Sequence, residues 1–339
     1  MKNLLTLLIV LPFLSFGQGW QKYFNEFSAG TSIQQTTDGG YIICGMDTTS
    51  YGDLLLLKTD NNGNQQWSQT FGGTGYDFGS SVQQTTDGGY IICGSTAILI
   101  NQSPGVLWFG DSDVWLIKTD DNGIEQWSQT FGSPTYFTMG TSVQQTTDGG
   151  YIITGITYNP GSSSDVYLIK TDGSGNQQWE QIYYHPFDDD FAYSVKQTTD
   201  GGYIIGGTYV CCTNSAASPD IFLLKTDISG NQQWLKIYGG LYWHDEGYSV
   251  QQTTDGGYII CGSGVDTLTG FNGGNYDLYL IKTDGNGNIT STFNIPTPSS
   301  NINLEKVVDI LGREITPQIN IPFIEIYNDG STNKKVIID

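Results

Sequence analysis

The sequence predicts an all-β protein, a five-bladed β-propeller built from four-stranded blades. Three observations predict this fold. A nearly identical stretch, typified by residues 81–94, occurs five times, and its Asp-Gly-Gly triplet begins at residues 38, 87, 148, 200 and 255. Repeats of about 50 residues indicate a propeller or another repeat array. Each repeat also carries two glycine-containing turns around one apolar run, and the segment that the last repeat lacks is found at the start of the chain.

Each repeat divides into four extended segments. In the second repeat an Asp87-Gly88 turn joins the first two, and Asp-Gly is a strong hairpin signal because both central residues need positive φ. A turn at residues 120–123 joins the last two. No segment shows the 3.6-residue period of a helix, so we expect four antiparallel strands. In this repeat they are residues 81–85, 90–93, 114–119 and 126–131.

The third segment of each repeat is apolar at four consecutive positions. These runs are residues 54–57, 114–117, 166–169, 221–224 and 278–281. A continuous apolar strand is buried on both faces, as in a small sheet between two neighbouring sheets. Radial stacking of such sheets makes a propeller. A β-solenoid is the structural alternative, but the tight hairpin turns favour the propeller.

The fourth segment begins with tryptophan in four repeats. These residues are Trp67, Trp127, Trp179 and Trp234. The fifth repeat has no tryptophan there, whereas Trp20 precedes the first repeat. We therefore expect the N-terminal strand to complete the last sheet and close a ring of five blades.

Two resemblances accompany the repeat. Residues 58–67 resemble the tryptophan-docking motif of quinoprotein dehydrogenase propellers, although the string is one residue shorter and those rings have eight blades. The likeness covers a turn and a tryptophan, so it implies the fold and not a quinone cofactor. The repeats as a whole resemble a family of secreted bacterial proteins with the motif Thr-x-Asp-Gly-Gly-Tyr-Ile. Its members are described variously, from propeller to endoglucanase, and the motif itself implies no activity.

The N-terminus and the charge predict an exported protein. Residues 1–17 have the Lys2 positive charge, the apolar run 4–16 and the small-residue cleavage site of a secretory signal peptide. No later run approaches the ~20 apolar residues of a transmembrane helix. The net charge of −21, from 34 acidic and 13 basic residues, argues against binding nucleic acid or an anionic membrane. We expect the propeller to occupy residues 18–293.

A different composition marks residues 294–339. A Pro/Ser-rich linker at 296–300 precedes this tail. Residues 309–314, 327–330 and the basic, then apolar, terminus resemble the C-terminal sorting domain of the type IX secretion system, with Asn328 in place of the usual Asp. The resemblance implies a small β domain that the type IX secretion machinery recognises and commonly removes. The predicted location is secreted or on the outer cell surface.

Cysteines give little support for redox or metal chemistry. Cys44, Cys93 and Cys261 share a repeat position that Thr154 and Gly206 fill in the other two repeats. This pattern predicts a small buried side chain. The pair Cys211-Cys212 lies outside the repeat, where a strained vicinal disulfide and a metal site both remain open.

Residues repeated in every blade are expected to serve the blade, because a catalytic site is asymmetric. We expect the lysine of Lys-Thr-Asp to pair, within or between blades, with the aspartate that opens the third segment. The lysines are Lys58, Lys118, Lys170, Lys225 and Lys282. The aspartates are Asp53, Asp113, Asp165, Asp220 and Asp277.

The functional face is predicted from loop length. Strand alternation places the connections between the second and third segments, and between one repeat and the next, on one face of the ring. These connections hold all the length variation, and binding sites concentrate in such loops. Two of them carry both histidines, each flanked by aromatic rings and carboxylates. The candidate binding residues are Tyr184, His185, Asp188, Asp189, Asp190, Tyr242, Trp243, His244, Asp245, Glu246 and Trp108.

Several interpretations of these loops remain open. Aromatic rings and carboxylates can bind a glycan. Ca²⁺ would take the oxygen cluster, and Zn²⁺ would take His185 and His244 with a carboxylate. Glycoside hydrolysis needs two carboxylates roughly 5–10 Å apart, here among residues 188–190 with Asp245 or Glu246. The structural alternative is that the rings pack the loops against the blades while the acids are solvated.

The sequence holds no Ser-His-Asp order, HExxH, P-loop or paired CxxC motif, so no catalytic residue is assigned. We expect a binding or adhesion propeller that recognises an extracellular glycan or protein. A secreted, endoglucanase-like glycoside hydrolase is the alternative, and a purely structural surface module is the third. No cofactor is expected, with Ca²⁺ left open.

Overall fold

The computed structural model describes residues 19–48, 52–73, 75–97, 112–132, 137–158, 163–184, 188–210, 219–239, 244–264, 277–289, 304–308, 313–316, 323–327 and 332–335. Every regular element in these ranges is a β-strand, which confirms the all-β prediction. The predicted signal segment, residues 1–17, and Cys211-Cys212 lie outside them. Within the described ranges, no helix is long and apolar enough to cross a membrane.

The first four repeats each form a four-stranded antiparallel sheet in sequence order, as predicted. The first sheet is β1 (Phe27–Gln35), β2 (Tyr41–Asp47), β3 (Leu54–Thr59) and β4 (Gln65–Phe71). The second is β5 (Asp77–Gln84), β6 (Tyr90–Ala97), β7 (Ser112–Thr119) and β8 (Glu125–Phe131). The third is β9 (Phe137–Gln145), β10 (Tyr151–Tyr158), β11 (Ser164–Thr171) and β12 (Gln177–Tyr183). The fourth is β13 (Asp189–Gln197), β14 (Tyr203–Val210), β15 (Pro219–Thr226) and β16 (Gln232–Tyr238).

The fifth repeat forms a sheet of three strands, β17 (Glu246–Gln252), β18 (Tyr258–Gly264) and β19 (Asp277–Thr283). A separate compact unit, Ile289–Asp339, contains the antiparallel sheet β20 (Leu304–Val308), β21 (Phe323–Tyr327) and β22 (Thr332–Lys335). The repeats and the tail are therefore distinct units.

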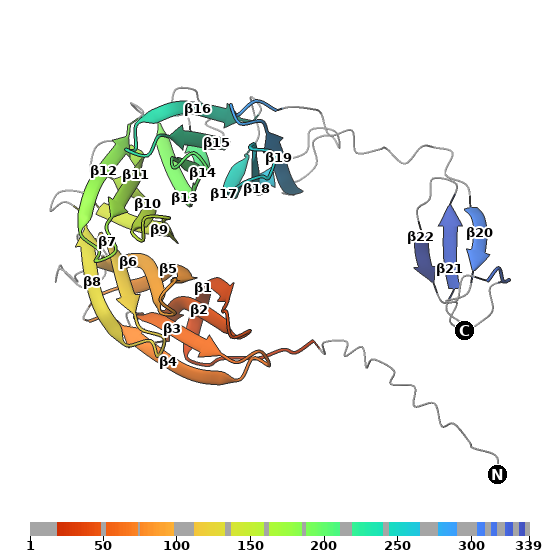
Figure 1. Ribbon diagram of the computed structural model, residues 1–339, viewed down its shortest axis with the longest axis horizontal. Helices are drawn as coiled ribbons and strands as arrows, with labels where there is room; N and C mark the ends of the chain where they lie inside the picture. Colours follow the sequence, from red (N-terminus) through yellow and green to blue (C-terminus); the bar gives the residue numbers. More distant parts are fainter. Residues whose placement is uncertain are drawn as a thin grey trace, which may run out of the picture. The chain divides into compact units, whose positions relative to one another are not determined.

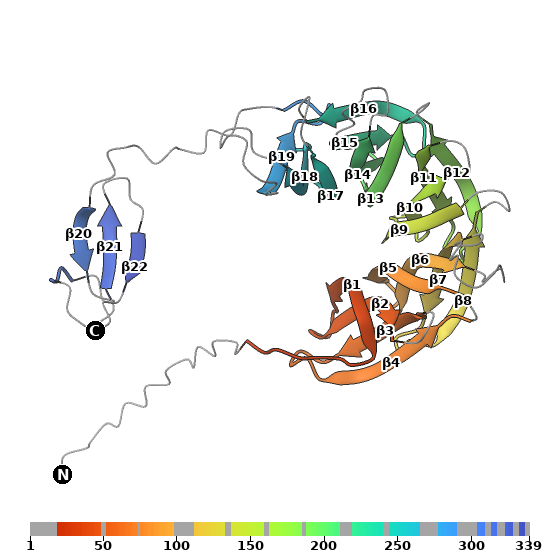
Figure 2. The same cartoon turned by 180° about the vertical axis from the view of Figure 1, so that it is seen from behind.

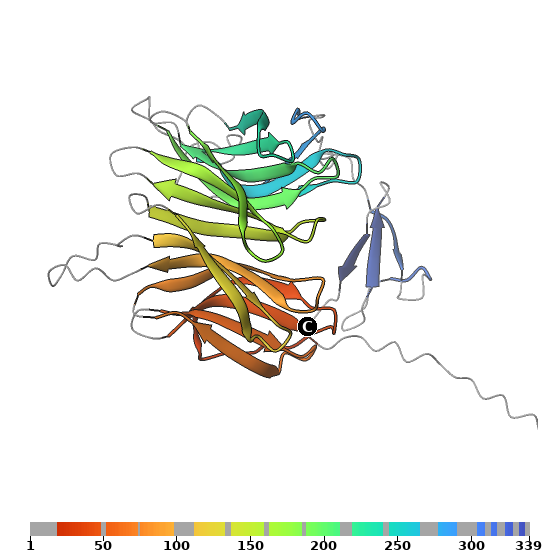
Figure 3. The same cartoon turned by 60° about the vertical axis from the view of Figure 1, so that its left-hand side comes forward.

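Successive sheets of the repeat unit pack face to face, as propeller blades do (Figures 1 and 2). The first strands β1, β5, β9, β13 and β17 lie innermost, and β4, β8, β12 and β16 lie outermost. Figure 3 shows the same sheets from the side. The core lies between sheets: Leu54 and Leu56 of the first pack against Val82 and Tyr90 of the second. All of β3 is buried, as the apolar run predicted.

The Asp-Gly-Gly turns hold the repeated lysines. Lys58 Nζ lies 2.7 Å from Asp38 Oδ2, and the same pair recurs in all five repeats. The prediction that the repeated lysines pair, within or between blades, with the aspartates that open the third segments, such as Asp53, is wrong. Lys58 and Asp53 stand five residues apart, about 16 Å along an extended strand. Lys58 therefore reaches the turn end of its blade while Asp53 lies at the loop end.

The tryptophans dock each sheet onto the next. Trp67 at the start of β4 packs on Tyr90 of the second sheet, with ring centroids 5.8 Å apart. The rings of Trp127, Trp179 and Trp234 make the same contact with the following sheet. Trp20 packs in this way on Tyr41 of the first sheet. Residues 19–26 form no strand, however, so the predicted pairing of this segment with the fifth sheet is not made in this structure.

The cysteine position of the repeat behaves as predicted where the side chain is enclosed. Cys44 and Cys93 are fully buried free thiols, and burial raises the pKa of Cys44 to about 12. Cys261 of the fifth sheet is also a free thiol and is only partly buried. These residues therefore pack as small apolar groups.

Candidate functional site

The predicted binding residues fall into two groups. His185, Tyr242, Trp243 and Trp108 lie outside the described residues. Those described come from the connections leading into β13 and β17. Tyr184 and His244 are exposed, and Asp189 and Glu246 are partly exposed. Asp188, Asp190 and Asp245 are buried.

The buried acids of this set fasten strand ends to loops. The hydroxyl of Tyr209 donates to Asp188 Oδ2 at 2.6 Å. The partly exposed Asp189 accepts the Ser164 amide on Oδ1 at 2.7 Å. The backbone amide of Asp245 donates to the carbonyl of Pro219 at 2.7 Å. These contacts join the fourth sheet's edge to its neighbours and leave Asp188 little access to a ligand.

Asp190 and Asp245 occupy a position that recurs at the start of successive innermost strands. Asp77 fills it in β5, and Thr138 fills it in β9. The Thr138 hydroxyl accepts the Val114 amide at 3.2 Å and donates to the Phe131 carbonyl at 3.1 Å. A residue at this recurring position connects one sheet to the next, which indicates a structural role.

The recurring carboxyls face other carboxyls. Burial, then the charges of Asp47 and Asp77, raises the pKa of Asp53 above its ordinary value. Burial and the charge of Asp245 raise the pKa of Asp220 in the same way. Like charges held close together disfavour the ionised state. These junctions therefore store electrostatic repulsion at neutral pH.

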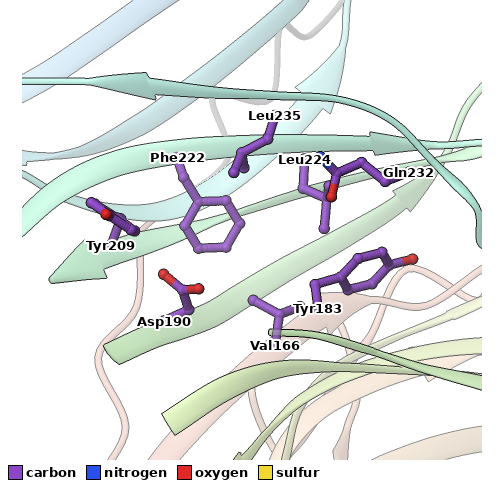
Figure 4. Close-up of a pocket in the computed structure, with 8 residues that line it drawn as sticks. All are labelled: Val166, Tyr183, Asp190, Tyr209, Phe222, Leu224, Gln232 and Leu235. Atoms are coloured by element: carbon purple, nitrogen blue, oxygen red, sulfur yellow. The ribbon is translucent and has the colours of Figure 1, made fainter. Parts of the chain in front are cut away.

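Asp190 also lines a small pocket between the third and fourth sheets (Figure 4). Its carboxyl points toward the ring of Phe222, and the other walls are mainly apolar. The remaining lining residues are Val166, Tyr183, Tyr209, Leu224, Gln232 and Leu235. The space admits about one water molecule, so it is too small for a sugar.

A more open site lies between β13 and β17. Each innermost strand has a bulged residue after a Gly or Ala and before a Ser, and β1 has a second irregularity at Ser28. It is a small hydroxyl residue in the first three sheets, namely Thr31, Ser80 and Thr141. In the fourth and fifth sheets it is Tyr193 and Tyr248. Because a bulge re-aims its side chain, these two rings leave the regular packing of the blade.

The two rings form an accessible aromatic pair. Their centroids are 5.9 Å apart and their planes are inclined by 58°. Tyr193 is 37% exposed and Tyr248 is 46% exposed. The Tyr248 hydroxyl donates to Glu246 and lies 3.3 Å from Ser263 Oγ. Burial, then Glu246 and the Tyr248 hydroxyl, raises the pKa of Tyr193, so the Tyr193 phenol is neutral at pH 7.

This aromatic pair was missed by sequence reasoning, which searched the loops. Tyr248 ends one of the two chosen loops but was not selected, and Tyr193 follows the other. A usable signal was present: tyrosine replaces the Thr or Ser that precedes the repeated Ser-Val or Ser-Ile. Residues that break a repeat are candidates for a function that the repeat itself does not supply.

The structure adds no support for Ca²⁺ or Zn²⁺ binding by the loop residues. Over the part of the chain that the structure describes, no three His, Cys, Asp or Glu side chains are grouped to hold a metal ion. The predicted zinc ligand His185 lies outside that part. Calcium or zinc binding in these loops stays a prediction from sequence.

Comparisons with known proteins give no family. No protein-family model and no curated protein matches the chain. An endo-arabinase from Bacteroides thetaiotaomicron is similar with a TM-score of 0.41 at 8% identity, covering 73% of this chain and 91% of that chain. A GH43 β-1,3-galactosidase solved with galactodeoxynojirimycin gives 0.39 at 12%, covering 73% and 89%. The tail fibre of Staphylococcus aureus phage P68 gives 0.35 at 10%, covering 78% and 51%. These TM-scores are too low to transfer an activity.

Proposed function

We propose that this chain is an exported binding propeller that recognises a glycan at the Tyr193–Tyr248 pair. The observation that carries the proposal is the replacement of a small hydroxyl residue by tyrosine on two adjacent innermost strands. The two rings that result are in contact and remain exposed. A structural position would keep the small residue of the other three sheets.

The chemistry of the pair suits a sugar. Aromatic faces pack against the C–H faces of pyranose rings, and tyrosine supplies this contact area at low cost in side-chain entropy. The Glu246 carboxylate and the Ser263 hydroxyl stand at the Tyr248 hydroxyl, where they can exchange hydrogen bonds with sugar hydroxyls. Apolar faces beside a few oriented polar groups are the usual composition of small-ligand sites.

Binding is favoured over hydrolysis by the burial of the acids. Hydrolysis requires two carboxyls that reach one glycosidic bond. Asp188, Asp190 and Asp245 are each at least nine-tenths buried. Among the residues that the structure describes, Glu246 is the carboxylate in contact with the aromatic pair, and a single acid meets only half of the requirement.

We also propose that five sheets close into a ring. Leu278 of β19 is 77% exposed, whereas its counterpart Leu54 is fully buried against the next sheet. Ile33 of β1 is 65% exposed, whereas its counterpart Val82 is buried against the preceding sheet. Packing the fifth sheet on the first would bury both apolar faces, at about 25 cal/mol per Å² of apolar area.

The export proposal rests on the two ends of the sequence. Residues 1–17 are a secretory signal, and the tail is a type IX sorting domain that the secretion machinery recognises. A protein exported by this route meets extracellular glycans, which agrees with an acidic, glycan-binding propeller. This route predicts that the mature chain is found outside the cell. It also predicts that a variant lacking residues 304–339 stays inside the cell.

The binding proposal is tested by titration with a panel of neutral and acidic oligosaccharides, using Tyr193→Thr/Tyr248→Thr. This double variant restores the residue type of the other sheets, so the fold is retained. We expect at least one glycan to bind below millimolar concentration, with a loss of tenfold or more in the variant. Tyr23→Thr, a change at an exposed ring of the N-terminal segment, is the control and should bind normally. No binding at 10 mM, or equal binding by the double variant, would overturn the proposal. If the wild-type protein released reducing ends from the oligosaccharides and Glu246→Gln abolished this release, the function would be hydrolysis and not binding alone.

A further inference from the structure

One lysine breaks the repeat beside the proposed glycan site. Lys196 lies in β13, at a position that holds glutamine in the other four repeats. Those residues are Gln34, Gln83, Gln144 and Gln251. A change from a neutral side chain that can accept a hydrogen bond to a cation that can only donate alters the chemistry of this junction.

The glutamines form one rung of a ladder between innermost strands. Gln34 Oε1 accepts the backbone amide of Gln84 in the next sheet at 2.6 Å. The second and third junctions repeat this bond at 2.7 and 2.6 Å, from Gln145 to Gln83 and from Gln197 to Gln144. At the fourth junction the corresponding donor is the amide of Gln252, and Lys196 stands in place of its acceptor.

The fourth junction is otherwise regular. The Val250 amide donates to Ser194 Oγ at 3.2 Å, as Val82 donates to Ser32 in the first junction. The Thr199 amide donates to Gln252 Oε1 at 2.8 Å. The strands β13 and β17 therefore keep their normal spacing, and Lys196 occupies the strand position from which the other junctions supply a glutamine oxygen.

Lys196 differs from the repeated lysines, each of which has an aspartate partner. Over the described residues, Lys196 has neither an ion pair nor a hydrogen bond. The side chain is partly buried, and burial lowers its pKa. At the fourth junction two donors, the Lys196 ammonium and the Gln252 amide, thus occupy the positions at which the other junctions pair one backbone amide with a glutamine oxygen.

We propose that the missing acceptor is a carboxylate of the bound glycan, so that the site recognises a uronic acid. This inference rests on the proposed function, because Lys196 and Tyr193 belong to the same strand and face the same neighbour, β17. Three residues along a strand span about 10 Å, close to the length of two sugar units. A sugar stacked on Tyr193 and Tyr248 would place a uronic acid one or two units away at Lys196, where a charge-assisted hydrogen bond forms.

The test compares uronic-acid oligosaccharides with their methyl esters, which keep the sugar rings and remove the charge. We expect the wild-type protein to bind the acid at least tenfold more tightly than the ester, and Lys196→Arg to keep this preference. Lys196→Gln restores the residue of the other repeats. It should lose the preference, keep ester binding, and raise the melting temperature of the free protein by about 2 °C through the restored hydrogen bond.

The outcomes separate the two proposals. If Tyr193→Thr/Tyr248→Thr abolishes glycan binding but acid and ester bind wild type equally, the uronic-acid inference fails and the proposed function stands. An unchanged preference in Lys196→Gln also overturns the inference, because a group other than Lys196 would then recognise the carboxylate. If neither acid, ester nor neutral glycan binds wild type, both proposals fail.

Discussion

The indole of Trp20 packs edge-on against the ring of Tyr41, with centroids 5.8 Å apart and planes inclined by 67°. Its Nε1 donates to the Asn61 carbonyl at 3.3 Å. Trp67 meets Tyr90 of the next sheet at the same 5.8 Å. The N-terminal segment therefore stands against the first sheet as an outer strand stands against the sheet that follows it. This relationship supports the proposed ring closure and predicts its register.

A disulfide tests that register. In the first sheet Leu56 pairs with Gln69, two residues after Trp67, so the same register pairs Leu280 with Lys22, two residues after Trp20. Directly opposite residues have Cα atoms about 4.5–5.5 Å apart, within disulfide range. We expect Lys22→Cys/Leu280→Cys to oxidise within one chain, seen as a faster band on a non-reducing gel that reverts on reduction. Crosslinking between chains instead would show that the two edges meet in a second copy.

The control for closure shifts one cysteine out of register. Lys22→Cys/Asp277→Cys places the thiols about three residues apart along the strand, roughly 10 Å, and should not oxidise. Trp20→Ala should also lower the free energy of unfolding by about 1–3 kcal/mol, less than a fully buried tryptophan because the indole is partly exposed. Equal oxidation in both pairs, with an unaltered melting temperature in Trp20→Ala, would contradict the closed ring.

The tryptophan docking predicts a sharp difference between two glycines. Gly123 has φ of +76°, and a Cβ there would lie 2.6 Å from the Trp67 ring. Gly88 has φ of +91°, and a Cβ there would have no atom within 4 Å. Both Ala variants incur the cost of a left-handed backbone, about 1 kcal/mol, but Gly123→Ala must also displace an indole. We expect urea unfolding to show a loss of about 3 kcal/mol for Gly123→Ala and about 1 kcal/mol for Gly88→Ala; equal losses would argue against the docking contact.

The lysine–aspartate turns predict a dependence of stability on acid pH. The hydrogen bonds from Lys58 and then Thr36 lower the pKa of Asp38 to about 2, below its value in the unfolded chain near 4. A lowered carboxyl pKa stabilises the fold above the unfolded pKa, and this contribution is lost as pH falls from about 4 to about 2. Asp38→Asn should lose about 1 kcal/mol at pH 7, a modest value because the Asp38 side chain is half exposed, and should show a flatter loss below pH 4.

A double-mutant cycle isolates this pair. Asp38→Asn introduced into a Lys58→Met background should have less effect than in wild type, because the buried ammonium that needs the carboxylate is gone. Urea midpoints measured between pH 2 and pH 7 give both comparisons. Additive effects of the two substitutions would show that the pair contributes nothing beyond its separate side chains.

The recurring carboxyl position predicts a stabilising substitution. Asp77 is 2% exposed and faces Asp53, whereas Thr138 makes neutral hydrogen bonds at the same position. The raised pKa of Asp53 means that its contribution favours folding at low pH and is lost as pH rises through the folded pKa. Asp77→Thr removes this repulsion and should raise the free energy of unfolding by about 1 kcal/mol at pH 7, with little gain near pH 3. The reciprocal substitution Thr138→Asp should lower the free energy of unfolding at pH 7 and have little effect at low pH. If the effects of both substitutions were independent of pH, the proposed repulsion would be wrong.

The candidate site depended largely on side-chain exposure, which the sequence repeat does not reveal. Sequence reasoning selected His244, Glu246 and the Asp188–Asp190 run because aromatic and acidic residues gather in variable loops. Burial then divided that set, leaving Glu246 accessible and Asp190 enclosed. No local pattern distinguishes the two, because exposure depends on which neighbouring sheet covers a residue.

The sequence by itself determined the all-β class, the four antiparallel strands of each full repeat, the largely buried third strand of the first four repeats and the residues that escape the repeat; in the fifth repeat Leu278 and Leu280 are exposed. It could do so because hairpin turns and apolar periodicity are local properties, repeated five times. Only the tertiary structure decided that Lys58 pairs with Asp38 and not Asp53, that Tyr193 meets Tyr248, and that the glutamines equivalent to Lys196 accept a backbone amide of the next sheet. These relationships join residues on different strands or sheets, so they follow from strand register and from the packing of one sheet on the next.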